Sequence, residues 1–256
     1  MFDGCPVVHL SDSVADLKHF LRALIAKTHR NVYNRPDTKI HTFKQLSSLV
    51  RLAHKYQIHD VQDQALTALQ THFASTFSSW DSIAVIEGDV RWGIEVIHLA
   101  RLTDTPAMLP IAFYECAQAG GSIVEGWRRE DGTVEYLSPD DLRRMIDGHA
   151  ALWRRFEPTL DRVFETRSSP ECASSITCNL RLGAMSADRG EAENGLNRPA
   201  LLHCWANIID EWSETYGFCE ACSDMLLKKM NVERYKLWRE LPRLFGLSID
   251  GWGSSP

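Results

Sequence analysis

The clearest hydrophobic pattern in this chain lies in Thr42–Phe73, where apolar side chains recur every three or four positions. Thr42 and Gln45 have the spacing of a capping box, which places the start of a first helix. Asp60 has the position of a second N-cap, after a corner at Gln57–His59. The two apolar stripes comprise Leu46, Leu49, Val50, Ala53 and Tyr56, then Val61, Ala65, Leu66, Leu69 and Phe73. Because the corner is too short to separate two helices, we predict a packed helical hairpin.

The residues before this hairpin predict a strand, a helix and a loop. Pro6–Leu10 is a short β-branched run, PVVHL, which is typical of a strand. Residues 11–13, SDS, are a helix-start signal, and the apolar spacing after them indicates a helix that runs to about Lys27. His29–Lys39 is rich in Asn, Pro and charged residues, so we expect a polar loop there.

This order of elements, with the segments DLKHFLRALI and FKQLSSLVRLAHKYQIHDVQDQALTAL, resembles the second half of a BTB/POZ domain of the fungal, basidiomycete type. The resemblance covers roughly Phe2–Phe73. The first half of that domain, with its opening hairpin and following helices, is absent, so either Met1 is not the true start or the chain is a shortened form. In such a form the side chains of Val7, Val8 and Leu10 would lie at a sheet edge without a partner. The resemblance implies protein binding through Val7–Phe73, by self-association or by recruitment of a cullin-type ubiquitin ligase scaffold.

Helical signals dominate after Phe73. A Ser-rich link at Ser75–Trp80 is followed by two helices, Val90–Leu102 and Ala107–Ala119, the second of which starts from Thr105-Pro106. Asp131-Gly132 lies between partly alternating residues, which favours a small hairpin. Two further helices are predicted, one from Ser138 to about Gly148 and one over Leu152–Phe164 that Pro158 interrupts or bends.

The last third of the chain changes in composition. Arg167–Pro199 is rich in Ser, Ala, Gly and Asn, and we predict a mobile loop over about residues 183–199. Helices are then expected at Leu201–Trp212 and Ser223–Leu244, with Pro242 bending or ending the second. We therefore predict a mainly α protein in three parts: a partial BTB/POZ domain (1–75), a helical extension (76–167) and a C-terminal helical module with cysteine pairs (168–256).

Charge and hydropathy narrow the class of partner. The net charge of −6 argues against a nucleic-acid binder or an anionic-membrane binder, both of which present a basic field. No apolar run approaches the roughly 18–20 residues that a membrane span needs, and the start lacks the pattern of a signal peptide. Seven cysteines in such a chain favour free thiols or metal ligands over disulfides. We expect a protein of the cytoplasm or nucleus.

Four cysteines form the most informative candidate site. Cys172 and Cys178 are followed, after the predicted loop, by Cys219 and Cys222. A structural zinc ion takes four such thiolates, and a C-x2-C pair just before a helix supplies two of them. One structural Zn is therefore expected, while unremarkable thiols and a redox CxxC are the alternatives.

Other residues bear on this site. His203 or Cys204 could replace one ligand, whereas Cys5 and Cys116 fit better as small core residues. The C-terminal segment FCEAC…RYKLWRELPRLFGL also resembles the tail of the same fungal BTB proteins, in which two cysteine pairs tend to occur together.

No catalytic motif is present. The chain has no nucleophile elbow, P-loop, dinucleotide-binding glycine motif or HExxH, so we expect neither an enzyme nor a small-molecule substrate. Three arginine doublets alternate with acidic residues and predict a solvated mixed-charge surface: Arg128-Arg129, Arg143-Arg144 and Arg154-Arg155. Four tryptophans are expected to anchor helix packing: Trp92, Trp153, Trp205 and Trp238. The sequence thus favours a non-enzymatic protein-interaction module, with a zinc-dependent binding or regulatory module of the C-terminal half as the alternative.

Overall fold

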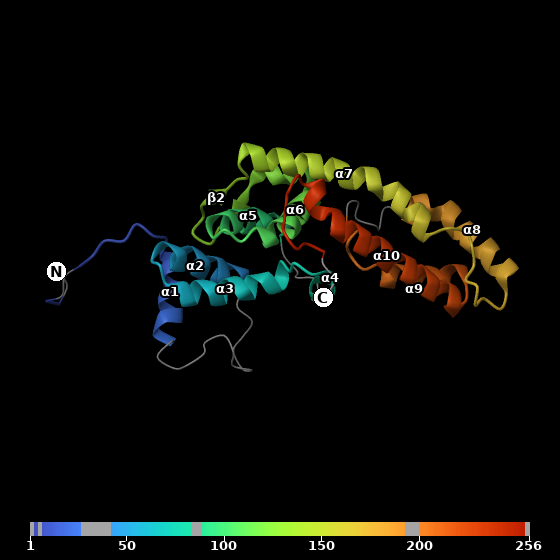
Figure 1. The fold of residues 1–256 in the computed structure, drawn as a ribbon, viewed down its shortest axis with the longest axis horizontal. Coiled ribbons are helices and arrows are strands. Elements are labelled where there is room, and N and C mark those ends of the chain that lie inside the picture. Colours follow the sequence, from blue (N-terminus) through green and yellow to red (C-terminus); the bar gives the residue numbers. More distant parts are fainter. Residues whose placement is uncertain (1–2, 5–6, 27–41, 83–88, 193–199, 254–256) are drawn as a thin grey trace.

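The computed structural model describes residues 3–4, 7–26, 42–82, 89–192 and 200–253 of the 256-residue chain. The fold is mainly α-helical, as the sequence predicts, and its described part contains a single two-stranded hairpin (Figure 1). The helices of the first half are α1 (Val14–Ala26), α2 (Phe43–Lys55), α3 (His59–His72), α4 (Phe77–Asp81), η1 (Val90–Trp92), α5 (Gly93–Leu102), η2 (Pro106–Met108), α6 (Leu109–Gln118) and η3 (Gly120–Glu125). The hairpin pairs β1 (Trp127–Arg128) with β2 (Val134–Glu135). The later helices are α7 (Pro139–Val163), α8 (Ser175–Ala192), α9 (Ala206–Tyr216) and α10 (Glu220–Leu244).

The predicted helical hairpin is present as α2 and α3, which pack against each other (Figure 1). The capping box is confirmed, because the Gln45 N–H donates to Thr42 Oγ1 (3.4 Å) and the Thr42 N–H donates to Gln45 Oε1 (3.1 Å). Asp60 is not the second N-cap. Helix α3 starts at His59, and the Asp60 carboxylate lies in its first turn. There its negative charge interacts favourably with the positive end of the helix dipole. Tyr56 ends α2 at the surface, where its hydroxyl donates to Asp12 (2.6 Å).

The predicted strand at residues 6–10 is wrong over its described part. Residues 7–10 have no regular structure, and the side chains of Val7 and Val8 are 65% and 77% exposed. A strand needs a neighbour for its backbone groups, and no described strand pairs with this segment. The helix-start signal is confirmed by α1, while the loop predicted at residues 29–39 lies outside the described residues.

The middle helices supply the cover that the N-terminal hairpin requires. Helix α2 packs on α5, and the buried side chains of α2, α3, α5, α6, α7 and α10 belong to one contiguous core. Part of the predicted Ser-rich link is helical instead: α4 starts at Phe77, with Thr76 accepting a hydrogen bond from the Ser79 N–H (3.4 Å). The small hairpin around Asp131-Gly132 is confirmed as β1–β2.

Helix α7 replaces two predicted helices. It runs without a break through Gly148 and Pro158 along the upper edge of the molecule (Figure 1). Pro158 cannot donate a hydrogen bond to the Arg154 carbonyl, but both residues lie on the exposed face, where solvent can satisfy that oxygen. Gly148 is no helix stop. A Cβ atom there would lie 2.1 Å from the Phe245 ring, so the glycine permits close packing of α7 on the end of α10.

The C-terminal helices also differ from their predicted bounds. The mobile loop predicted over residues 183–199 is wrong up to residue 192, because α8 continues to Ala192; the remaining positions lie outside the described residues. Helix α8 forms because Cys178, Leu182 and Met185 bury one face at helical spacing. Helix α9 begins five residues later than predicted, and α10 begins three residues earlier. Pro242 lies in the last turn of α10.

A largely buried ionic cluster joins α1, α2 and α5 to the β1–β2 hairpin. Glu95 of α5 is 3% exposed and accepts a hydrogen bond from the Arg51 guanidinium (2.7 Å). Asp16 of α1 accepts from Arg129 and, at 2.7 Å, from the Ser48 hydroxyl. The side chain of Arg129 is only 13% exposed, so the mixed-charge surface predicted for the arginine doublets is wrong at this position. These partners neutralise charges that burial alone would make costly.

An aromatic cluster ties α4 and the C-terminal tail to α10. Trp238 is fully buried and packs against Trp80, Phe77 and Trp252, with ring centroids 4.8–5.7 Å apart. The packing role predicted for the tryptophans is therefore confirmed for Trp238. It does not hold for Trp153, which is 40% exposed.

Candidate metal centre

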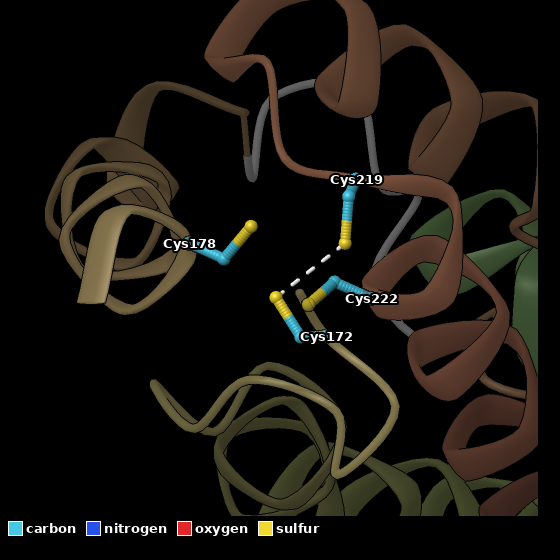
Figure 2. A group of neighbouring side chains, drawn as sticks. All are labelled: Cys172, Cys178, Cys219 and Cys222. Carbon is cyan, nitrogen blue, oxygen red and sulfur yellow. Dashed lines mark hydrogen bonds between the residues drawn. The ribbon is translucent and has the colours of Figure 1, made fainter. Parts of the chain in front are cut away.

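The first cysteine pair lies at the start of α8. Cys172 belongs to the segment between α7 and α8, where its N–H donates to the Ser169 carbonyl (3.0 Å) and closes a turn. Cys178 lies in the first turn of α8, and its N–H donates to the Ser174 carbonyl (3.0 Å). The turn and the helix start thus place both thiols on the same side of this segment (Figure 2).

The second pair lies at the corner between α9 and α10. Gly217 ends α9 with a φ of +73°, a left-handed conformation that favours glycine. Cys219 is the N-cap of α10, and the Cys222 N–H donates to its carbonyl (2.9 Å). A helix follows the C-x2-C pair, as predicted, although α10 begins inside the pair rather than after it. The positive end of the helix dipole favours the thiolate form at both positions.

These two pairs converge on one point. The four sulfur atoms of Cys172, Cys178, Cys219 and Cys222 all lie within 4.8 Å of one another, and Figure 2 shows them turned toward a common centre. The Cys172 and Cys219 sulfurs are 3.6 Å apart. Four thiolates at the usual Zn–S distance of about 2.3 Å in tetrahedral geometry have sulfurs about 3.8 Å apart. The spacing of the cluster therefore suits a tetrahedral metal ion.

Backbone N–H groups surround the sulfurs. The Ser169 N–H donates to Cys222 Sγ at 3.4 Å, and the N–H groups of Ser174 and Cys222 hydrogen-bond to the sulfurs of Cys172 and Cys219. Such donors stabilise negative charge on sulfur and fix its direction. Ser169 and Ser174 were not predicted from the sequence, because their contribution comes from the main chain, which has the same chemistry at almost every position.

The thiols of the cluster differ in acidity. Burial raises the pKa of Cys219, but the Cys222 N–H and the neighbouring thiols outweigh this effect and hold the pKa below its ordinary value. Burial dominates at Cys222 and raises the pKa of its thiol to about 12. Within the second pair, the Cys219 thiol is therefore the more acidic one.

Two contacts hold the metal-centre segments in place from outside the cluster. The Arg181 guanidinium on α8 donates to the Gly217 carbonyl at the end of α9. The Asn179 side-chain oxygen accepts a hydrogen bond from the Ser168 N–H (2.6 Å). Each contact links α8 to a segment that carries another cysteine and so helps to hold the four thiols together.

The two residues that were considered as replacement ligands, His203 and Cys204, lie outside the four-cysteine cluster. Cys204 is exposed, and the His203 ring stacks on Trp80 with ring centroids 6.5 Å apart. Burial, with a smaller effect of Arg234, lowers the pKa of His203. Cys116 is fully buried in the core, as predicted, and Cys5 lies outside the described residues. Within the described ranges, no second group of three or more Cys, His, Asp or Glu side chains gathers as this one does.

Comparison of the chain with protein-family models, with curated proteins and with solved structures finds no match. Among the described helices, none is both long enough and apolar enough to cross a membrane.

Proposed function

We propose that this chain is a non-enzymatic helical protein that holds one structural Zn²⁺ ion between Cys172, Cys178, Cys219 and Cys222. The convergence of the four sulfur atoms within 4.8 Å carries this proposal. A redox CxxC needs only two sulfurs and would leave the first pair unexplained. Unremarkable thiols would have no reason to meet from two pairs that lie 41 positions apart in the chain.

The arrangement favours a structural ion over a catalytic one. Catalytic zinc keeps a coordination position open for water or substrate, whereas four protein thiolates close the shell. Cys178 and Cys222 are also buried, at 2% and 0% exposure, so solvent reaches the centre only past Cys172 and Cys219. With Zn²⁺ bound, four thiolates leave a net charge of −2, which the helix N-termini and the surrounding N–H groups offset.

Metal analysis of the purified full-length chain tests this proposal. We expect about one equivalent of zinc per chain, because the four ligands form one tetrahedral site. Replacement by Co²⁺ should give the thiolate-to-cobalt charge-transfer band and the intense visible absorption of a tetrahedral sulfur site. The Cys204→Ser variant, which alters an exposed thiol outside the cluster, should retain both results. Less than about half an equivalent of zinc after growth in zinc-supplemented medium would contradict the proposal.

A second observation supports protein binding through the N-terminal part. Large apolar side chains are exposed on the segment before α1 and on α1 itself: Val7 (65%), Val8 (77%), Leu10 (46%), Val14 (83%) and Leu21 (49%). A row of this kind at one end of a molecule is typical of an interaction surface. It lies within the segment that resembles a BTB/POZ domain, so we propose that this surface binds a second copy of the chain or a cullin-type scaffold.

Light scattering coupled to size-exclusion chromatography tests the N-terminal surface. We expect the protein to self-associate, and the Val14→Asp/Leu21→Asp variant to elute as a monomer, because buried carboxylates oppose an apolar interface. The Val124→Asp/Ile146→Asp variant places the same charges on exposed apolar positions of η3 and α7 and should leave association unchanged. A monomeric protein that also fails to bind a purified cullin-type scaffold would remove this second proposal.

A further inference from the structure

A groove lies beside the metal centre and is not explained by it. Its volume is about 440 Å³. One wall is the outer face of α10, and the opposite wall is formed by Arg162 of α7 and the turn Ser169–Glu171. The hydrogen bond from the Ser169 N–H to Cys222 Sγ fixes this turn against α10, so the groove has a defined width.

The floor of the groove is apolar. Met225 and Val232 of α10 lie there with Pro170 of the turn and Ala221 between the second cysteine pair. Val232 is 53% exposed. An apolar floor of this size can take one or two large side chains of a partner.

The rim of the groove is basic. It is lined by two carboxylates, Glu171 and Glu233, and by four cations: Arg162, Lys228, Lys229 and Lys236. Glu233 is already shared between Arg162 and Lys236, at 2.7 Å from each. Lys229 is paired with Glu165 (3.0 Å), whereas Lys228 has no acidic partner among the described residues. The rim therefore has a small excess of positive charge, although the chain has a net charge of −6.

We propose that this groove binds a short acidic segment of a partner protein, with its apolar side chains on Met225 and Val232 and a carboxylate at Lys228. Charge complementarity selects the acidic character, and the apolar floor selects a peptide over a bare anion. Nucleic acid fits less well, because no aromatic side chain lines the groove for base stacking. The proposal goes beyond the structural zinc ion, and it rests on that ion only in that the centre fixes one wall.

Fluorescence anisotropy with a labelled peptide of about 12 residues, in which Asp and Glu flank two Leu residues, tests the proposal. We expect saturable binding with a Kd in the micromolar range that weakens as salt is added. The Lys228→Glu/Lys229→Glu and Val232→Asp variants should each weaken binding at least about tenfold, because the first repels the carboxylates and the second the apolar anchors.

Controls separate the groove from general charge and from the metal. The Arg143→Glu/Val124→Asp variant changes an exposed cation and an exposed apolar residue away from the groove and should bind as the parent does. Zinc content is measured in the same samples, so a parent protein that holds its full zinc content and does not bind the peptide overturns the groove proposal alone. Equal affinity of the parent and the Lys228→Glu/Lys229→Glu variant would overturn it, and so would tighter binding of single-stranded DNA or anionic vesicles than of the peptide.

Discussion

A Cys222→Ser variant is expected to lose its bound zinc and to unfold at a lower temperature than the parent protein. Structural zinc contributes about 10 kcal/mol or more in small zinc-finger peptides, which have no other core. Because this chain has an extensive core of its own, we expect a smaller loss of about 4 kcal/mol. For a chain of this size that corresponds to a melting temperature lower by roughly 8–16 °C, measured by circular dichroism or calorimetry.

Two comparisons identify the metal as the cause of this loss. Cys116→Ser introduces a hydroxyl at an equally buried cysteine outside the cluster, so it measures the cost of that substitution while zinc is retained. A chelator should lower the melting temperature of the parent to that of Cys222→Ser and should have no further effect on the variant. If the chelator leaves the parent unchanged, the zinc ion does not hold the C-terminal helices together.

A Glu95→Ala variant is expected to lose about 2–3 kcal/mol of the free energy of unfolding. Glu95 is 3% exposed and accepts hydrogen bonds from Arg51 (2.7 Å) and from the Trp127 indole N–H (2.8 Å). Its removal leaves the indole N–H without its acceptor and removes one of the two carboxylates that bind Arg51, whose other partner is Glu135 (3.2 Å). A buried donor without a partner costs about 1–3 kcal/mol, and a lost hydrogen bond to a charged group costs a similar amount. Urea unfolding followed by circular dichroism measures the difference.

The matched control for Glu95 is Glu240. Its side chain is 37% exposed and pairs with Arg155 and Arg243 at the surface of α10. Because solvent screens such pairs, Glu240→Ala should cost less than about 1 kcal/mol. If Glu95→Ala lowers the free energy of unfolding as little as Glu240→Ala does, water reaches the ionic cluster. The cluster then does not determine how the β1–β2 hairpin packs on α2 and α5.

The N-terminal hairpin could be predicted because its signals are local. The capping box of Thr42 and Gln45, the helical spacing of the apolar residues and the short corner at Gln57 all act within a few residues. The gathering of the four cysteines was predicted for a related reason, since thiols in a chain without secretion signals have few roles and the C-x2-C spacing is specific.

The long helices α7 and α8 could not be predicted in full. Pro158 signals a break, yet it lies on the exposed side of α7, where the free carbonyl meets solvent. The composition of residues 183–192 is that of a loop, but packing of Leu182 and Met185 against the core outweighs these weak local preferences. In both segments tertiary packing decides the conformation.

The ionic cluster could not be predicted from the sequence for a different reason. Asp16, Arg51, Glu95 and Arg129 lie on four separate elements, and each has the surroundings of an ordinary surface charge when read along the chain. Only the fold brings them together. Distant complementary charges leave no periodic signal, unlike apolar stripes or helix caps.

The proposed metal centre has a consequence for a chain that is cut. Its ligands come from both ends of the segment between Cys178 and Cys219, so with zinc bound this segment is a covalent and coordinative ring. A single protease cut inside the ring would leave two fragments that share one metal ion and the packed helices α8, α9 and α10. We expect the cut protein to sediment as one particle, because the metal ion and the shared core both join its fragments. The same closure allows insertions in this segment at little cost in stability, because the positions of its two ends are already fixed.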